Sequence, residues 1–205
     1  SESFTAYALF YYAAQAIAAG QPDAGWEAVQ RHYTAREEND NPWDGPPQMS
    51  GEGNLHPQWG RRYMSYPASW YVLWAIGGVR IDQLRGEIDI RPSWPTDWGD
   101  TLTDLQVFLP GFQAQVNACY ETNTWQIDFR LKRMTGDSMY FNRIKTRLPD
   151  SFDPAPTRID VTGCPRENIH IQPDGLVQIH QTVYLEKPDD GFTITAQPGR
   201  GALQE

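Results

Sequence analysis

The sequence is poor in cysteine, in histidine and in positive charge. It holds two cysteines, Cys119 and Cys164, and four histidines among 205 residues. No Cys-x-x-Cys or His-x-x-His spacing occurs, so neither a disulfide framework nor a metal site is expected, and the two thiols could pair or stay free. Lysine and arginine number 17 against 26 acidic residues, for a net charge of −9. A nucleic-acid partner needs a basic patch, and none is expected here; nor is a cofactor.

A long, uninterrupted apolar run is also missing. Residues 4–22 carry no charge, but three tyrosines and two glutamines interrupt them and no basic segment precedes them. Neither a signal peptide nor a membrane span is therefore expected. Nothing in the sequence indicates a cellular compartment.

Three segments in the first part of the chain have helical patterns. Residues 4–19 are rich in alanine, and Gly20 and Pro22 end the pattern. Residues 22–36 have a polar face, and residues 69–76 are apolar before Gly77-Gly78. Because the first of these helices has no charged face, we expect it to be buried nearly all round, against a partner chain or a further segment.

After Gly78 the spacing of apolar residues changes to the alternation of β-strands. Residues 80–90 predict a strand pair that bends at Gly86. Short strands with turn residues between them follow and predict an antiparallel sandwich. They cover 104–109, 112–120, 125–132, 139–147, 158–161, 168–171, 176–181 and 192–196.

The segment 41–70 between the second and third helical patterns is unusual for its length. Loops this long in a compact domain are usually functional or disordered, and the aromatic residues here argue against disorder. Tryptophan faces beside carboxylate, imidazole and guanidinium groups suit the apolar faces and hydroxyls of a sugar. The candidate substrate-binding residues are Trp43, Glu52, His56, Trp59, Arg61 and Arg62.

The order of several short motifs over residues 6–91 resembles the end of the catalytic domain of glycoside hydrolase family 116, which includes β-glucosidases and the non-lysosomal glucosylceramidase. The motifs are Ala6-Tyr7-Ala8 with Ala14 and Gly20, Trp26 to Tyr33, Asn41-Pro42-Trp43, Trp59-Gly60 with Tyr63, Ala68-Ser69-Trp70, Gly77-Gly78 and Gly86-Glu87-Ile88. The resemblance implies the last helices of an (α/α)6 barrel. It also implies that the nucleophile and the acid/base carboxylate lie upstream, so that no catalytic residue is expected in this chain.

The chain departs from this family at two positions. The family keeps a glutamate and an arginine that are thought to hold sugar hydroxyls. With Gly60 and Tyr63 aligned, this chain has His56 and Ser65 in their places. With Asn41-Pro42-Trp43 aligned instead, Gly45 takes the position of the glutamate. The departures weaken the expectation that the substrate is a plain β-glucoside.

These observations together predict an α+β chain. Residues 1–92 would form terminal helices and an active-site loop of an (α/α)6 barrel, and residues 93–205 a β-sandwich domain. The predicted function is that of a C-terminal fragment or small subunit of a retaining, exo-acting glycoside hydrolase, inactive alone. Its expected partners are the remainder of the barrel, as another chain or a cleaved N-terminal part, and a glycoside substrate. The alternative is a non-catalytic carbohydrate-binding or assembly subunit.

Overall fold

The computed structural model describes residues 3–38, 48–50, 66–109, 111–121, 124–149, 152–154 and 157–197. The chain divides into two compact units. One, which we call the helical unit, comprises Ser1–Ile76 and Ser93–Thr96. The other, the strand unit, comprises Gly77–Pro92 and Asp97–Glu205.

Among the described residues of the helical unit the structure has three α-helices, as the sequence predicted. They are α1 (Ala6–Ala18), α2 (Pro22–Glu38) and α3 (Trp70–Gly77), with the 3-10 helix η1 (Tyr66–Ser69) before α3. Two short strands, β1 (Ser3–Thr5) and β2 (Gln48–Ser50), pair antiparallel. Helix α1 ends at Gly20, whose φ of 83° is in the left-handed region. The N–H groups of Gly20 and Gln21 bond to the carbonyls of Ile17 and Ala16, as in a Schellman motif.

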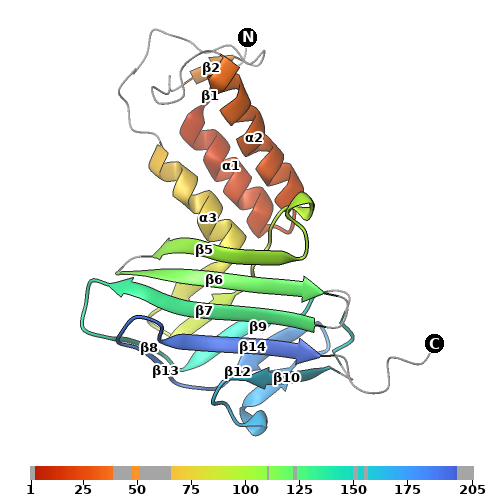
Figure 1. Cartoon of the computed structure of the whole chain (residues 1–205), viewed down its shortest axis with the longest axis vertical. Helices are drawn as coiled ribbons and strands as arrows, with labels where there is room; N and C mark the ends of the chain where they lie inside the picture. The colour runs from red at the N-terminus through yellow and green to blue at the C-terminus, as the bar shows by residue number, and fades with distance from the viewer. Residues whose placement is uncertain are drawn as a thin grey trace, which may run out of the picture. The chain divides into compact units, whose positions relative to one another are not determined.

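Helices α1 and α2 pack as an antiparallel pair (Figure 1). Gly25 of α2 lies so close to the backbone of Ala13 and the side chain of Ile17 that a Cβ at this position would clash. The rings of Phe10 and His32 meet nearly at a right angle, with centroids 5.4 Å apart. The opposite face of α1 is exposed at Tyr12. The expectation that a partner chain or a further segment covers this helix stays a prediction.

The predicted fold class is wrong. The described part of the chain holds three α-helices and mostly antiparallel β-strands, and it contains no (α/α)6 barrel. Periodicity identifies each helix separately, but it does not count the helices that pack around them. The three helical patterns were therefore correct, and the barrel inferred from their resemblance was not.

The strand unit contains two five-stranded sheets, which lie one in front of the other as in a sandwich (Figure 1). The first, here called the β7 sheet, has the order β10-β14-β7-β6-β5 and is antiparallel throughout. Its strands are β5 (Thr101–Leu109), β6 (Phe112–Glu121), β7 (Thr124–Met134), β10 (Arg158–Val161) and β14 (Gly191–Gln197). The short helix η2 (Thr96–Trp98) precedes β5.

The second sheet, here called the β9 sheet, has the order β11-β12-β9-β4-β3. Its strands are β3 (Val79–Asp82), β4 (Glu87–Ile90), β9 (Arg143–Arg147), β11 (Ile169–Ile171) and β12 (Leu176–Ile179). The predicted strand pair that bends at Gly86 is confirmed by β3 and β4. Strand β4 also pairs in parallel with β9, from a distant part of the sequence. The 3-10 helix η3 (Arg166–Asn168) leads into β11.

A further two-stranded sheet joins β8 (Met139–Phe141) to β13 (Val183–Leu185). The core of the strand unit consists of the inward residues of both large sheets and of this two-stranded sheet. Its largest fully buried side chains include Trp125, Phe129, Phe141, Phe192 and Ile144.

One carboxylate is buried within the β9 sheet. The side chain of Glu87 is 9% exposed and pairs with Arg143 at 2.5 Å and with Lys145 at 2.6 Å, both on the neighbouring β9. The hydrogen bond from Lys145 is the main cause that lowers the pKa of Glu87, while burial acts in the opposite direction. These ion pairs fasten β4 to β9 beside their parallel backbone ladder.

Candidate functional site

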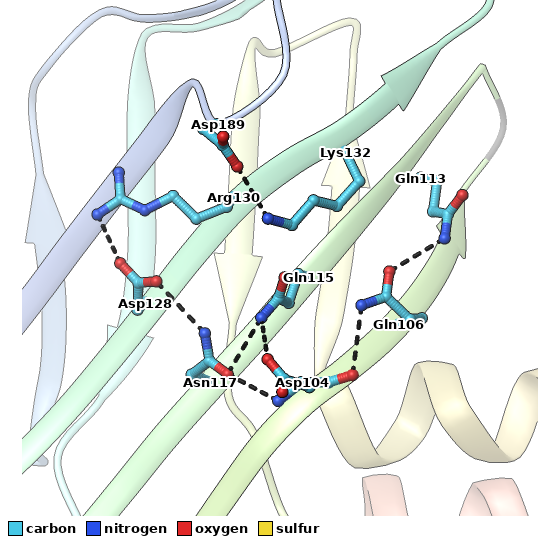
Figure 2. A network of polar contacts seen from close by, with 9 residues as sticks. All are labelled: Asp104, Gln106, Gln113, Gln115, Asn117, Asp128, Arg130, Lys132 and Asp189. Atoms are coloured by element: carbon cyan, nitrogen blue, oxygen red, sulfur yellow. Dashed lines mark hydrogen bonds and ion pairs between the residues drawn. The ribbon is translucent and has the colours of Figure 1, made fainter.

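The outward face of the β7 sheet carries the largest group of interacting polar side chains that we find in the described part of the chain. Along β6 the residues alternate between buried and half-buried, which places Gln113, Gln115 and Asn117 on the same outward face. Neighbouring strands and one turn add further polar groups to it. Seven of these residues bond in one network, and Lys132 with Asp189 forms a separate ion pair (Figure 2). Together they form what we call the polar face: Asp104, Gln106, Gln113, Gln115, Asn117, Asp128, Arg130, Lys132 and Asp189.

Asp104 enters this face from an irregular point in the edge strand β5. The register with β6 shifts between Leu102 and Leu105, and Asp104 there has a φ of 54°. Its backbone N–H donates to Oδ1 of Asn117 at 2.7 Å, and its carboxylate accepts a hydrogen bond from Gln115. A β-bulge re-aims a side chain, and left-handed backbone at a residue other than glycine is more frequent at functional sites than elsewhere.

Three glutamine side chains line the polar face between β5 and β6. Gln106 and Gln115 are direct partners in the antiparallel register. Gln113 donates from Nε2 to Oε1 of Gln106 at 3.0 Å, and Gln106 donates to the carbonyl oxygen of Asp104 at 3.3 Å. Each amide is thus held in a defined orientation and still carries groups that can bond to a ligand.

A second group of contacts crosses from β6 to β7 and β14. Asn117 faces Asp128 in the register and donates to its Oδ2 at 3.4 Å. The other oxygen of Asp128 pairs with Arg130 at 2.6 Å and accepts from the Thr193 hydroxyl at 2.7 Å. Because Arg130 also donates to Thr193 at 2.7 Å, these three side chains form a closed triangle.

The turn before β14 completes the polar face. Lys132 pairs with Asp189 at 2.8 Å, and Asp189 is held with a φ of 72°. The next residue, Asp190, accepts from the backbone N–H groups of Glu186 and Lys187, both at 2.9 Å. These two bonds are the main causes that lower the pKa of Asp190, and they fix the turn that presents Asp189.

The polar face mixes both kinds of hydrogen-bonding group over one surface. Amides supply donors and acceptors, carboxylates accept, and Arg130 and Lys132 donate. Seven of the nine side chains are half-buried, whereas Asp104 and Asp189 are exposed. The groups are held in place by one another but remain accessible, which suits a ligand with many hydroxyls.

The six residues predicted from the sequence to bind substrate, Trp43, Glu52, His56, Trp59, Arg61 and Arg62, lie outside the described residues. Their role stays a prediction. The polar face was missed, although residues 113–117 alternate polar and apolar in a way that could have indicated it. The hydrogen bonds and ion pairs of this face join residues on different strands, and the sequence alone does not give the register of those strands.

The described residues offer neither a metal site nor a membrane-spanning helix. Within the ranges given above, no group of three or more His, Cys, Asp and Glu side chains could hold a metal. No described helix combines the length and the apolar character needed to cross a membrane. Cys119 and Cys164 are free thiols, and burial raises the pKa of Cys164.

Comparisons with known proteins give one distant similarity. No protein-family model and no curated protein matches the chain. Among solved structures it is similar to an alpha-L-rhamnosidase from Dictyoglumus thermophilum, a glycoside hydrolase, with 11% sequence identity and a TM-score of 0.37. The match covers 65% of this chain but 13% of that one. At this level the similarity assigns no function to the chain.

Proposed function

We propose that this chain is a carbohydrate-binding component of a glycoside hydrolase and that the polar face binds the sugar. The observation that carries the proposal is the row of amides beside Asp104 and Asp128, held together across β5, β6 and β7. The assignment of sugar binding to the polar face rests on the chemistry of that face and on none of the candidate residues in the segment 41–70.

Sugar hydroxyls explain why such a face suits a carbohydrate. Each hydroxyl donates one hydrogen bond and accepts two, so a good site offers donors and acceptors side by side. Gln115 and Asn117 do so within one strand, and Arg130 adds a charge-assisted donor on the next. Because these side chains are already ordered by mutual contacts, a ligand loses less free energy in ordering them.

The second part of the proposal concerns hydrolysis. A retaining glycosidase needs two carboxyl groups about 5–5.5 Å apart across the scissile bond. We propose that a further segment or chain supplies this pair, while Trp43, Glu52, His56, Trp59, Arg61 and Arg62 contribute to the substrate-binding surface. The order of the short motifs over residues 6–91 supports this division of roles.

Exposed aromatic rings on the helical unit also support a further segment. Among its described residues, the large exposed side chains, between 42% and 58% accessible, are Tyr11, Tyr12, Tyr33, Trp70 and Tyr71. Large exposed apolar patches usually mark surfaces that another chain or segment covers. We therefore propose that such a partner packs on these helices.

Calorimetric titration tests the sugar-binding role of the polar face. The full chain is titrated with cellotetraose, xylotetraose, maltotetraose and mannotetraose, and the double variant Gln115→Ala, Asn117→Ala is compared with it. We expect the double variant to lose at least tenfold in affinity for every saccharide that the polar face binds. The control Gln178→Ala removes a half-buried amide from the β9 sheet and should leave binding unchanged. Equal affinity of the double variant and the wild type would refute the role of the polar face.

The alternative is a binding module with no part in hydrolysis. The two are separated by purifying the chain with whatever associates with it and assaying that assembly on aryl glycosides. A fall in turnover after Glu52→Gln or His56→Ala supports the proposal that this chain is a component of the hydrolase. An assembly that binds saccharides through the polar face but hydrolyses none of the aryl glycosides supports the alternative.

A further inference from the structure

Two tyrosines lie side by side on the two-stranded sheet β8–β13. Tyr140 and Tyr184 are direct partners in the antiparallel register. Their ring centroids are 6.2 Å apart, and the ring planes are tilted by 42°. The residues are 57% and 60% exposed, so both rings are open to solvent.

The sheet fixes the backbone positions from which these rings project. On each strand the neighbours of the tyrosine point the other way: Phe141, Val183 and Leu185 are buried, at 1%, 6% and 0% exposed. The exposed rings therefore stand on a ribbon anchored by its opposite face. A pair of tyrosines fixed in this manner presents a large, rigid aromatic surface at low cost in conformational entropy.

Polar residues flank the two rings. Continuing the register by one position places Asn142 opposite Thr182, and the Thr182 hydroxyl bonds to Oδ1 of Asn142 at 3.3 Å. On the other side, the next positions are the exposed residues Ser138 and Glu186. The surface thus consists of an aromatic centre between two polar pairs, each with free hydrogen-bonding capacity.

We propose that Tyr140 and Tyr184 form a second sugar-binding site, separate from the polar face, which stacks on a pyranose ring. A pyranose has a face of C–H groups, which packs against the π-face of an aromatic ring, and a rim of hydroxyls. Asn142 and Thr182 lie where they can bond to that rim. The inference depends on the proposed function for the class of its ligand, but it uses different residues.

The surroundings favour a small saccharide over a protein partner. A stable protein interface buries roughly 800 Å² on each side and has an apolar core. Here the aromatic centre is two residues wide and polar pairs border it on both strands. Such a surface matches one or two sugar units.

Titration of single variants tests the site. The full chain and the variants Tyr140→Ala, Tyr184→Ala, Tyr140→Phe and Tyr184→Phe are titrated with the four tetrasaccharides named above. For at least one of them we expect each alanine variant to lose tenfold or more in affinity, and each phenylalanine variant, which keeps the ring, to stay within threefold of the wild type. Tyr12→Ala removes an equally exposed ring from α1 and should have no effect.

A footprint on the unaltered chain gives a second readout that does not depend on how the variants fold. Tetranitromethane nitrates exposed tyrosines, and mass spectrometry of the digested protein measures the extent at each one. A bound tetrasaccharide should reduce nitration of Tyr140 and Tyr184 at least threefold and leave Tyr12 unchanged. No reduction at either tyrosine, with wild-type affinity of both alanine variants, overturns the inference.

The same titrations separate this inference from the proposed function. Loss of affinity in the tyrosine variants but not in Gln115→Ala, Asn117→Ala supports the tyrosine site and refutes the polar face. The reverse result refutes the tyrosine site and supports the polar face. A chain that binds none of the four tetrasaccharides overturns both.

Discussion

The β7 sheet holds its interacting charges on an accessible face, whereas the β9 sheet holds one carboxylate, Glu87, nearly out of reach of water. Asp128 of the β7 sheet is half-buried and shares its oxygens among an amide, a hydroxyl and Arg130. Glu87 is committed to two cations on the next strand. The difference separates two roles for a carboxylate in one fold: the accessible one can exchange partners with a ligand, and the buried one fixes strand pairing.

The largest effect is expected where the two sheets do not differ, in their shared apolar core. Phe129 of β7 is fully buried, and its ring stacks on Phe192 with centroids 5.3 Å apart. Ile144 of β9 is equally buried. Phe129→Ala should lower the free energy of unfolding by about 3–5 kcal/mol and Ile144→Ala by about 2–5 kcal/mol, as measured by urea denaturation. Asp128→Ala, on the outward face of β7, should cost less, about 1–2 kcal/mol, because it removes hydrogen bonds from a half-buried site and leaves no core cavity. Losses confined to one sheet would show that the sheets do not share a core.

The next largest loss of unfolding free energy should differ between the two sheets. Glu87→Ala leaves Arg143 and Lys145 without their carboxylate and should cost about 2–3 kcal/mol in urea denaturation. Asp160 of β10 also pairs with two arginines, Arg158 and Arg166, but its side chain is 52% exposed. Asp160→Ala should therefore cost below about 1 kcal/mol. Similar losses of unfolding free energy in Glu87→Ala and Asp160→Ala would contradict the distinction between a buried and an exposed carboxylate.

Acid should weaken the β9 sheet through the same carboxylate. The pKa of Glu87 is lowered from its ordinary value of 4.5, chiefly by the Lys145 hydrogen bond. A carboxyl group whose pKa is lower in the folded state contributes stability at pH values above 4.5, and this contribution disappears as the pH falls through the folded-state pKa. Comparing Glu87→Gln with the wild type in urea between pH 7 and pH 3 isolates this group from the other carboxylates. The difference in unfolding free energy should shrink as the pH falls, and a constant difference would contradict the assignment.

The smallest expected effect concerns the backbone of the polar face. Asp104 adopts a φ of 54°, where a Cβ is unfavourable. Asp104→Ala should cost about 1 kcal/mol, because alanine keeps the strain and loses the carboxylate. Asp104→Gly should stay within about 0.5 kcal/mol of the wild type in thermal unfolding, because the relieved strain offsets the lost contacts. A glycine variant less stable than the alanine variant would contradict this account.

Local features of the fold could be predicted from the sequence. The spacing of apolar residues, with Gly and Pro at the ends, predicted each helix to within two residues at either end. The alternation of polar and apolar residues predicted most of the strands. The strand predicted over 158–161 is confirmed as β10, whereas the one predicted over 139–147 is interrupted at Asn142 between β8 and β9. The three-residue strand β13 is too short to show alternation and was missed, whereas β11, of the same length, is confirmed within the strand predicted over 168–171.

Features that depend on contacts between distant segments could not be predicted. The parallel pairing of β4 with β9 joins residues more than 50 positions apart, and no local pattern specifies it. The polar face needs the register of β5, β6 and β7 together, so its residues were not grouped in advance. The barrel was inferred from a resemblance in motif order, which says nothing about how many helices a chain contains.

The parallel pairing of β4 with β9 also sets an order of events during synthesis. When the ribosome has made Glu87–Ile90, its partner Arg143–Arg147 does not yet exist. At roughly 5–20 residues per second, the nascent chain waits several seconds before that partner is made, and longer until it leaves the ribosome. During this interval Ile88 and Ile90, which end up fully buried, have no strand on one side. The two isoleucines of this segment therefore reach their full burial only after β9 has been made.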